Sequence, residues 1–131
     1  MQTLSKAAIV AVVDIQTEIV QVPEWGGAVA VRELTGTERD AFEQSMVRVD
    51  TAGKRHTDLG NMRAKLCAWC IVDGESGDRL FADDHLAELG NKSAVALDRI
   101  FRVAQRINGM GATEDVEKNS APDPSASSTF A

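Results

Sequence analysis

The chain has 131 residues, with 14 Lys and Arg against 20 Asp and Glu, which gives a formal net charge of −6. This is about the length of one domain, and the acidic balance disfavours nucleic acid as a partner, because phosphate binding needs clustered cations. A composition with 44% hydrophobic residues excludes collagen, a disulfide scaffold and a chain that is disordered throughout.

The N-terminal part predicts a short helix followed by a β-hairpin. Ser5 can cap a helix over the alanine-rich segment 4–13. That segment is too short for a membrane span, and the acidic residues behind it differ from a signal-peptide cleavage site, so we expect a cytosolic protein. β-branched residues alternate from Ile15 to Val22, the segment 23–27 contains Pro and two Gly, and 28–34 reads as a second strand.

A helix is predicted to begin at Thr35, because Thr35 and Glu38 have the spacing of a capping box. Helical spacing places Phe42, Met46 and Val49 on its apolar face, so the helix is expected to extend to Val49. A polar break over 51–56 would follow it.

Three more helices are predicted in the second half of the chain. The first covers 61–72, the second covers 83–90 with an Asp cap and a Gly stop, and the third covers 93–108 with a continuous apolar stripe. Residues 113–118 would add one or two turns.

Together these elements predict an α+β fold, in which one N-terminal β-hairpin packs on a small bundle of three to four helices. The expected organisation is a single domain over residues 1–118, followed by a flexible tail over 119–131. The tail is rich in Ser, Ala and Pro and is expected to be disordered, because it has too few apolar residues to bury.

Cys67 and Cys70 form a CxxC motif inside a predicted helix. Structural zinc needs four ligands, and neither His56 nor His85 is spaced as part of a second pair. A redox CxxC usually lies at a helix N-terminus, where the thiol pKa is lowered. The spacing therefore favours two core residues and no metal or cofactor, with a small cytosolic metal or redox protein as the alternative.

Other charged groups are interpreted as surface features. Asp83–His85 is typical of the acidic start of a helix, and the glycine-containing segment 73–78 indicates a turn. Arg99, Arg102 and Arg106 share a helix face, which is interpreted as a solvated face in a chain of net negative charge. The chain contains no recognised catalytic motif, so we do not expect an enzyme.

Residues 22–42 carry three adjoining motifs: VPEWGG at the turn, VRELTG at the end of the second strand and ERDAF at the start of the next helix. This segment resembles the N-terminal signature of tail assembly chaperones of long-tailed bacteriophages. The resemblance continues through 63–73 and 79–81 to the last helix, so it covers most of residues 15–118. The apolar segment 7–13 departs from it, because a more polar lead-in would be expected.

The resemblance implies a non-enzymatic, non-structural viral protein of the host cell cytoplasm. Such chaperones coat the long helical tape measure protein, keep it soluble, help to recruit tail tube subunits and leave before the virion is complete. The alternative from another class is a structural tail or head–tail connector subunit that stays in the virion. No membrane association is expected.

Four side chains are candidates for partner binding under this interpretation: Trp25, Met46, Met62 and Met110. Flexible methionines suit a surface that accepts many registers along one client, although the same residues fit a core. Trp25, in a glycine-rich turn, either folds back on the core or contacts a partner. Self-association is also expected, because the edge strand of the hairpin can pair with a neighbour.

Overall fold

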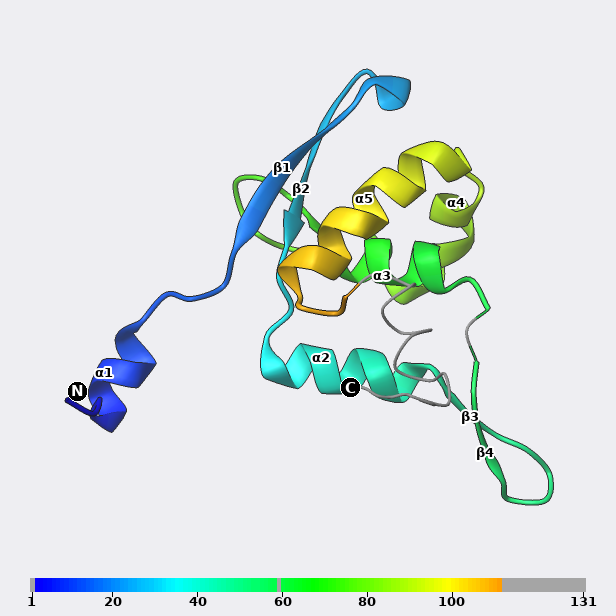
Figure 1. Ribbon diagram of the computed structural model, residues 1–131. Coiled ribbons are helices and arrows are strands. Elements are labelled where there is room, and N and C mark those ends of the chain that lie inside the picture. Colours follow the sequence, from blue (N-terminus) through cyan, green and yellow to red (C-terminus); the bar gives the residue numbers. More distant parts are fainter. Residues whose placement is uncertain (1, 59, 112–131) are drawn as a thin grey trace, which may run out of the picture.

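The computed structural model describes residues 2–58 and 60–111, and it confirms the α+β fold (Figure 1). The helix turns predicted over 113–118 and the tail predicted over 119–131 lie outside the described residues. No helix in the described part of the chain is long and apolar enough to cross a membrane.

The predicted N-terminal hairpin is present and forms most of a three-stranded sheet. Strand β1 (Thr17–Val22) pairs antiparallel with β2 (Gly27–Arg32), and β2 pairs on its other side with the short strand β5 (Ile71–Val72). The hairpin turns through a 3-10 helix, η1 (Pro23–Trp25), which ends at Gly26 with a φ of 74°. Glycine adopts this left-handed conformation readily, because it has no Cβ.

The described residues form five α-helices, close to their predicted positions: α1 (Lys6–Ala11), α2 (Gly36–Ser45), α3 (Met62–Cys70), α4 (Leu86–Gly90) and α5 (Ala94–Ile107). The side chains of Ser5, Thr35 and Ser93 cap α1, α2 and α5 by accepting a backbone N–H of the first turn. At α2 the capping box is complete, because Glu38 also accepts the Thr35 N–H. Side-chain caps thus fix three of the predicted helix starts.

The helix predicted to reach Val49 ends earlier, at Ser45. Strand β3 (Val47–Val49) follows it and pairs with β4 (Arg55–Thr57), so the predicted polar break is a second hairpin. Asp50 closes this hairpin, because its carboxylate accepts the N–H groups of Ala52 and Lys54 and lies 2.8 Å from His56 Nε2. These local bonds favour the turn over a continued helix.

Two further boundaries differ from the prediction. Helix α3 ends at Cys70, because the β-branched Ile71 and Val72 pair with strand β2. The helix predicted over 83–90 begins as a 3-10 turn, η2 (Asp83–His85), with Ala82 at its N-cap and no Asp cap. The end of this helix also differs from the prediction, because Gly90 is the last residue of α4 and does not follow the helix as a stop.

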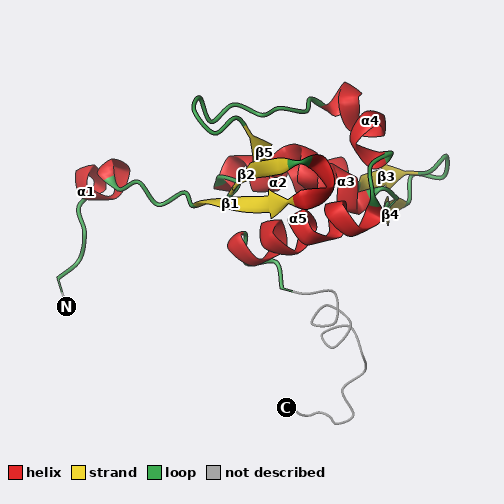
Figure 2. Cartoon of the chain, turned by 90° about the horizontal axis from the view of Figure 1, so that it is seen from above, coloured by secondary structure: helices red, strands yellow, loops and turns green. Residues whose placement is uncertain are grey.

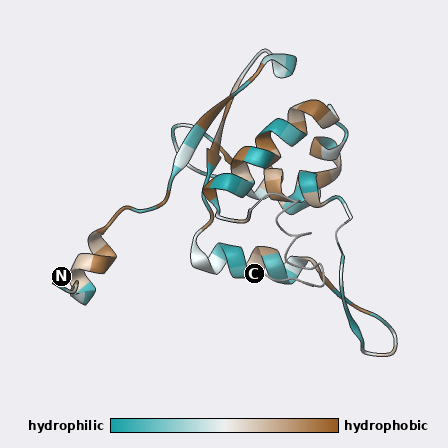
Figure 3. Ribbon diagram, viewed as in Figure 1, coloured by the Kyte–Doolittle hydropathy of each residue, from teal (hydrophilic) through white to brown (hydrophobic). Residues whose placement is uncertain are grey.

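The core lies between the sheet and helices α3 and α5. Its largest fully buried side chains come from every layer: Phe42, Leu66, Ile71, Leu89, Ile100, Val22, Val31, Cys67 and Cys70. Figure 2 shows the sheet and these helices as one body, from which α1 stands apart. Figure 3 shows that α1 and the segment after it are hydrophobic, although α1 has no buried residue.

Asn108 joins four parts of this core at the end of α5. Its Oδ1 accepts the Leu34 N–H at 2.8 Å, and its Nδ2 donates to the Ala104 carbonyl at 2.8 Å and approaches Cys70 Sγ at 3.6 Å. Its own carbonyl accepts a bond of 3.0 Å from Arg39 of α2. Asn108 thus links α5 to α3, to α2 and to the segment between β2 and α2.

Candidate functional site

A surface cleft lies between the start of α3 and the first half of α5, and we call it the α3–α5 cleft. Its volume is about 360 Å³. Apolar groups of Met62, Ala64, Leu97 and Phe101 line it. A cleft of this size and lining accepts a few apolar side chains of a partner.

Among the residues that line the α3–α5 cleft, Gly90 of α4 lies close to Asn61 and Ala64 at the start of α3. Asn61 precedes α3 in the left-handed conformation, with a φ of 60°. A Cβ on Gly90 would lie 3.3 Å from Asn61 Oδ1 and 3.7 Å from the Ala64 Cβ. Glycine at position 90 therefore lets the end of α4 approach α3 closely.

The rim of the α3–α5 cleft is cationic. The Arg63 guanidinium lies over the Phe101 ring, 5.7 Å from its centroid, and its Nε is 3.4 Å from Asp98 Oδ1. Asp98 also accepts a shorter bond of 2.7 Å from Arg102. Lys92 lies on the rim as well and is exposed. A partner that combines apolar and acidic groups fits this lining.

The four predicted partner-binding residues do not form one surface. Trp25, Met46, Met62 and Met110 are all half-buried and pack against the core from different elements. Met62 alone among them lines the α3–α5 cleft. Trp25 lies at the hairpin tip and packs against the core. Of the two arrangements expected for this side chain, folding back on the core and contact with a partner, the structure has the first. Their role in binding stays a prediction.

A smaller cavity of about 180 Å³ lies beside Trp69 of α3. The Arg79 guanidinium lies 4.7 Å from the centroid of the Trp69 ring, and the Phe42 ring meets it edge-on at 5.8 Å. Arg79 also donates to the carbonyls of Ala68 and Phe81. This cation–π contact ties the loop after β5 to α3.

The two cysteines are buried in the core and are not bonded to each other. Cys67 Sγ lies 3.6 Å from the Leu97 carbonyl oxygen, and burial raises the pKa of both thiols to about 12. At neutral pH they are therefore protonated, whereas metal binding and thiol nucleophiles need the thiolate. No group of three or more His, Cys, Asp or Glu in the described ranges is arranged to hold a metal ion.

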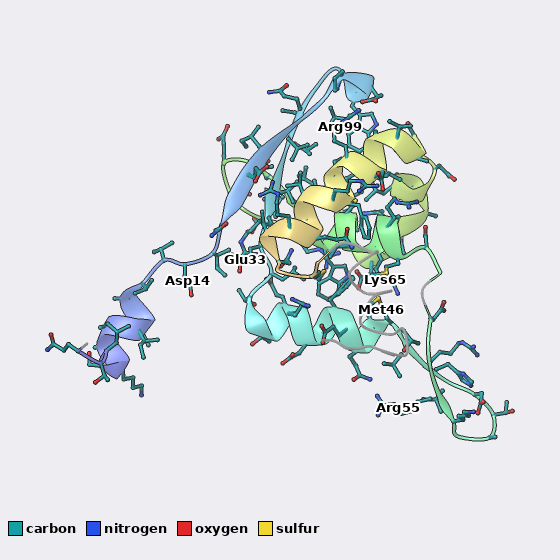
Figure 4. All side chains as sticks on the ribbon, viewed as in Figure 1. Asp14, Glu33, Met46, Arg55, Lys65 and Arg99 are labelled. Carbon is teal, nitrogen blue, oxygen red and sulfur yellow. The ribbon has the colours of Figure 1, made fainter. Side chains whose placement is uncertain are left out.

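Two of the arginines of α5, Arg99 and Arg106, bond to the N-terminal hairpin. Arg99 donates two bonds, of 2.6 and 2.8 Å, to the Glu24 carboxylate at the hairpin tip, and Arg106 lies 2.7 Å from Glu18 of β1. Figure 4 shows Arg99 between α5 and this tip. The bond from Arg99 lowers the pKa of Glu24 to about 2. These pairs join the hairpin to α5, so the face predicted as solvated is partly an internal contact.

Comparisons with known proteins give one match. The family model described as phage tail assembly chaperone matches residues 3–119 of the 131. Neither the curated proteins nor the solved structures gave a match. Because the family model covers most of the sequence, the chain belongs to the phage tail assembly chaperone family.

Proposed function

We propose that this protein is a non-enzymatic chaperone that binds the tape measure protein in the host cell cytoplasm and keeps it soluble. It also helps to recruit tail tube subunits and is absent from the finished virion. The observation that carries this proposal is the family match over residues 3–119. A tape measure is a long amphipathic helix, which self-associates unless its apolar face is covered.

The α3–α5 cleft is the proposed site for that client. An amphipathic helix binds by placing a few apolar side chains in a groove, and Met62, Leu97 and Phe101 supply apolar walls here. Arg63 and Lys92 on the rim would pair with acidic side chains that flank those anchors. The flexible Met62 side chain suits different anchors in successive stretches of the client. Trp25, Met46 and Met110 are proposed as further contacts outside the cleft.

The test is co-expression of the tape measure protein with tagged variants of this chain. In Met62→Glu a carboxylate enters the wall of the α3–α5 cleft, and we expect recovery of the tape measure protein to fall at least about tenfold, the effect of losing about 1.4 kcal/mol. The matched control is Leu80→Glu, which places the same charge at a side chain 52% exposed outside the cleft. Both variants should retain the wild-type circular dichroism spectrum.

Equal recovery of the tape measure protein by Met62→Glu and Leu80→Glu would contradict the proposal that the client binds in the α3–α5 cleft.

Mass spectrometry of purified virions provides a separate test of the chaperone role. A chaperone is absent from the particle, whereas a structural tail or head–tail connector subunit is present at a fixed copy number.

A further inference from the structure

Strand β1 presents a free backbone edge. Gln16 and Glu33 are a hydrogen-bonded pair, since the Gln16 carbonyl accepts the Glu33 N–H at 2.8 Å. Such pairs alternate along an antiparallel ladder, so Glu18, Val20 and Val22 also bond to β2. Thr17, Ile19 and Gln21 therefore direct their backbone N–H and C=O groups away from β2. Among the described residues, the sheet order β1-β2-β5 leaves this side of β1 without a neighbouring strand.

Sheet edges are commonly protected by Lys, Pro or a covering segment. Strand β1 itself contains neither Lys nor Pro, and no strand in the part of the chain that the structure describes lies along its outer side. Strand β1 reads TEIVQV, and its one charged side chain, Glu18, is paired with Arg106 of α5. The other edges among the described strands are guarded. The outer side of β5 meets Arg79 through a bridge from Val72, and the β3–β4 hairpin carries exposed basic side chains.

Apolar surface continues along and beyond the same edge. Ile19 is 62% exposed on the face of β1 that points away from α5. Upstream of it, α1 has no buried residue, and Val13 after α1 is 92% exposed. A helix of six residues is not stable by itself in water, so α1 needs a partner surface. Figure 1 shows α1 held away from the body of its own chain.

We propose that β1 pairs antiparallel with β1 of a second copy of this chain, about a two-fold axis at Ile19. The sheet then continues across both copies, with Ile19 beside the partner's Ile19 and Thr17 beside the partner's Gln21. Because the strands run in opposite directions, each α1 segment passes the hairpin end of the other copy. There its apolar side chains are covered by the partner.

A second copy fits this edge better than an unrelated strand because the edge is self-complementary. Its outward positions are symmetric about Ile19, with uncharged Thr17 and Gln21 on either side. A two-fold axis at Ile19 thus brings no like charges together and engages all three residues whose backbone groups are free. A contact of this kind is isologous and closes as a dimer.

Disulfide trapping tests the register directly. Ile19→Cys places two thiols across the axis, where Cα atoms about 5.5 Å apart suit a disulfide. We expect a disulfide-linked dimer to form rapidly on mild oxidation. Thr17→Cys alone and Gln21→Cys alone should form little disulfide-linked dimer, because neither variant places two thiols side by side. Their equimolar mixture should form the mixed disulfide-linked dimer. The native Cys67 and Cys70 are buried and do not compete.

The matched control is Val49→Cys, on strand β3, where the side chain is 60% exposed. Trapping of Val49→Cys as fast as Ile19→Cys would mean random collision and would overturn the proposal. Failure of Ile19→Cys to form dimers would overturn it as well.

Analytical ultracentrifugation provides a second measurement on the unmodified chain. We expect a wild-type dimer that Ile19→Lys weakens by at least about tenfold in dissociation constant, with an unchanged circular dichroism spectrum, because the Ile19 side chain is largely exposed. Removal of residues 2–13 should weaken the dimer too. A wild-type chain that remains monomeric at every concentration contradicts the contact. This outcome leaves client recovery through the α3–α5 cleft unaffected, so the two proposals fail separately.

Discussion

Cys67 and Cys70 form a CxxC motif, which is typical of metal or redox sites, but in this fold both side chains pack in the hydrophobic core. Both side chains are fully buried, and desolvation raises the pKa of both thiols to about 12. We expect Cys67→Ala and Cys70→Ala each to lower the free energy of unfolding by about 1–3 kcal/mol, as is usual for loss of a small buried group. Urea unfolding measures this cost.

The same cysteine variants test the alternative of a metal or redox protein. Recovery of the tape measure protein should be unchanged in Cys67→Ala and Cys70→Ala, because neither thiol is accessible to a partner. Stoichiometric zinc in the wild-type protein, or loss of client binding in a folded Cys67→Ala variant, would contradict the assignment of these residues to the core.

The ion pair between Glu24 and Arg99 predicts a specific pH dependence. The pKa of Glu24 falls from an ordinary value of 4.5 to about 2, chiefly because Arg99 donates to its carboxylate. A lowered pKa in the folded state adds stability above pH 4.5, and that stability is lost as the pH falls through about 2. The thermal unfolding midpoint should therefore decline over this range, and added salt should weaken the effect.

Carboxyl NMR titration assigns this effect to one residue. The Glu24 resonance is expected to titrate near pH 2 in the wild type and near its ordinary value in Arg99→Gln. Arg102→Gln is the matched control, since Arg102 bonds to Asp98 on the same helix and not to Glu24. A wild-type Glu24 midpoint near 4.5 would show that the pair does not form in solution.

At the scale of elements, the capping box of α2 fixes where the chain leaves the sheet. Thr35 accepts the Glu38 N–H at 3.1 Å, and Glu38 accepts the Thr35 N–H at 2.9 Å. We expect Thr35→Ala to lower the free energy of unfolding by about 1 kcal/mol. Thr37→Ala, at an exposed position in the same turn, should cost clearly less. Equal losses in the two variants would contradict a specific role for the cap.

The elements that the sequence predicted correctly carry their own local signals. The N-terminal hairpin has Pro23 and Gly26 in its turn, and the helices that begin after Thr35 and Ser93 have side-chain caps. Such signals act over three or four residues and depend little on distant contacts. They can therefore be recognised without knowledge of the fold.

The elements that the sequence missed depend on pairing. Strands β3 and β4 have three residues each, and Met46 and Val49 also fit a helical spacing, so periodicity favoured a longer α2. Strand β5 has two residues, and its partner β2 lies some forty positions earlier in the chain. A strand this short is set by its neighbour and not by its own propensity.

The sequence could indicate the apolar residues of the candidate site, but not that the two helices would bring them together in one cleft. The apolar stripe of the last helix and the apolar side of the predicted helix over 61–72 were both apparent from spacing. That Met62 and Phe101 face one cleft depends on how α3 packs on α5. The close approach of Gly90 to Asn61, both of which line the cleft, has no local signature in the sequence.

At the scale of the whole molecule, two separate surfaces are proposed to bind two different partners. The α3–α5 cleft is proposed for the client, and the free edge of β1 is proposed for a second copy. A dimer would present two clefts to one long helix, and linked sites bind more tightly than single ones when the geometry lets both engage. We therefore expect Ile19→Lys to weaken client recovery less than Met62→Glu, as measured in parallel pull-downs.

The central claim is that this chain keeps a long helical client in solution. The direct measurement is the amount of tape measure protein that stays in the supernatant after centrifugation, when it is expressed with and without this chain. We predict that it sediments as aggregate alone, and that it remains soluble and co-purifies with this chain when the two are expressed together. Tape measure protein that is equally soluble in both cases, or that never co-purifies, would contradict the account.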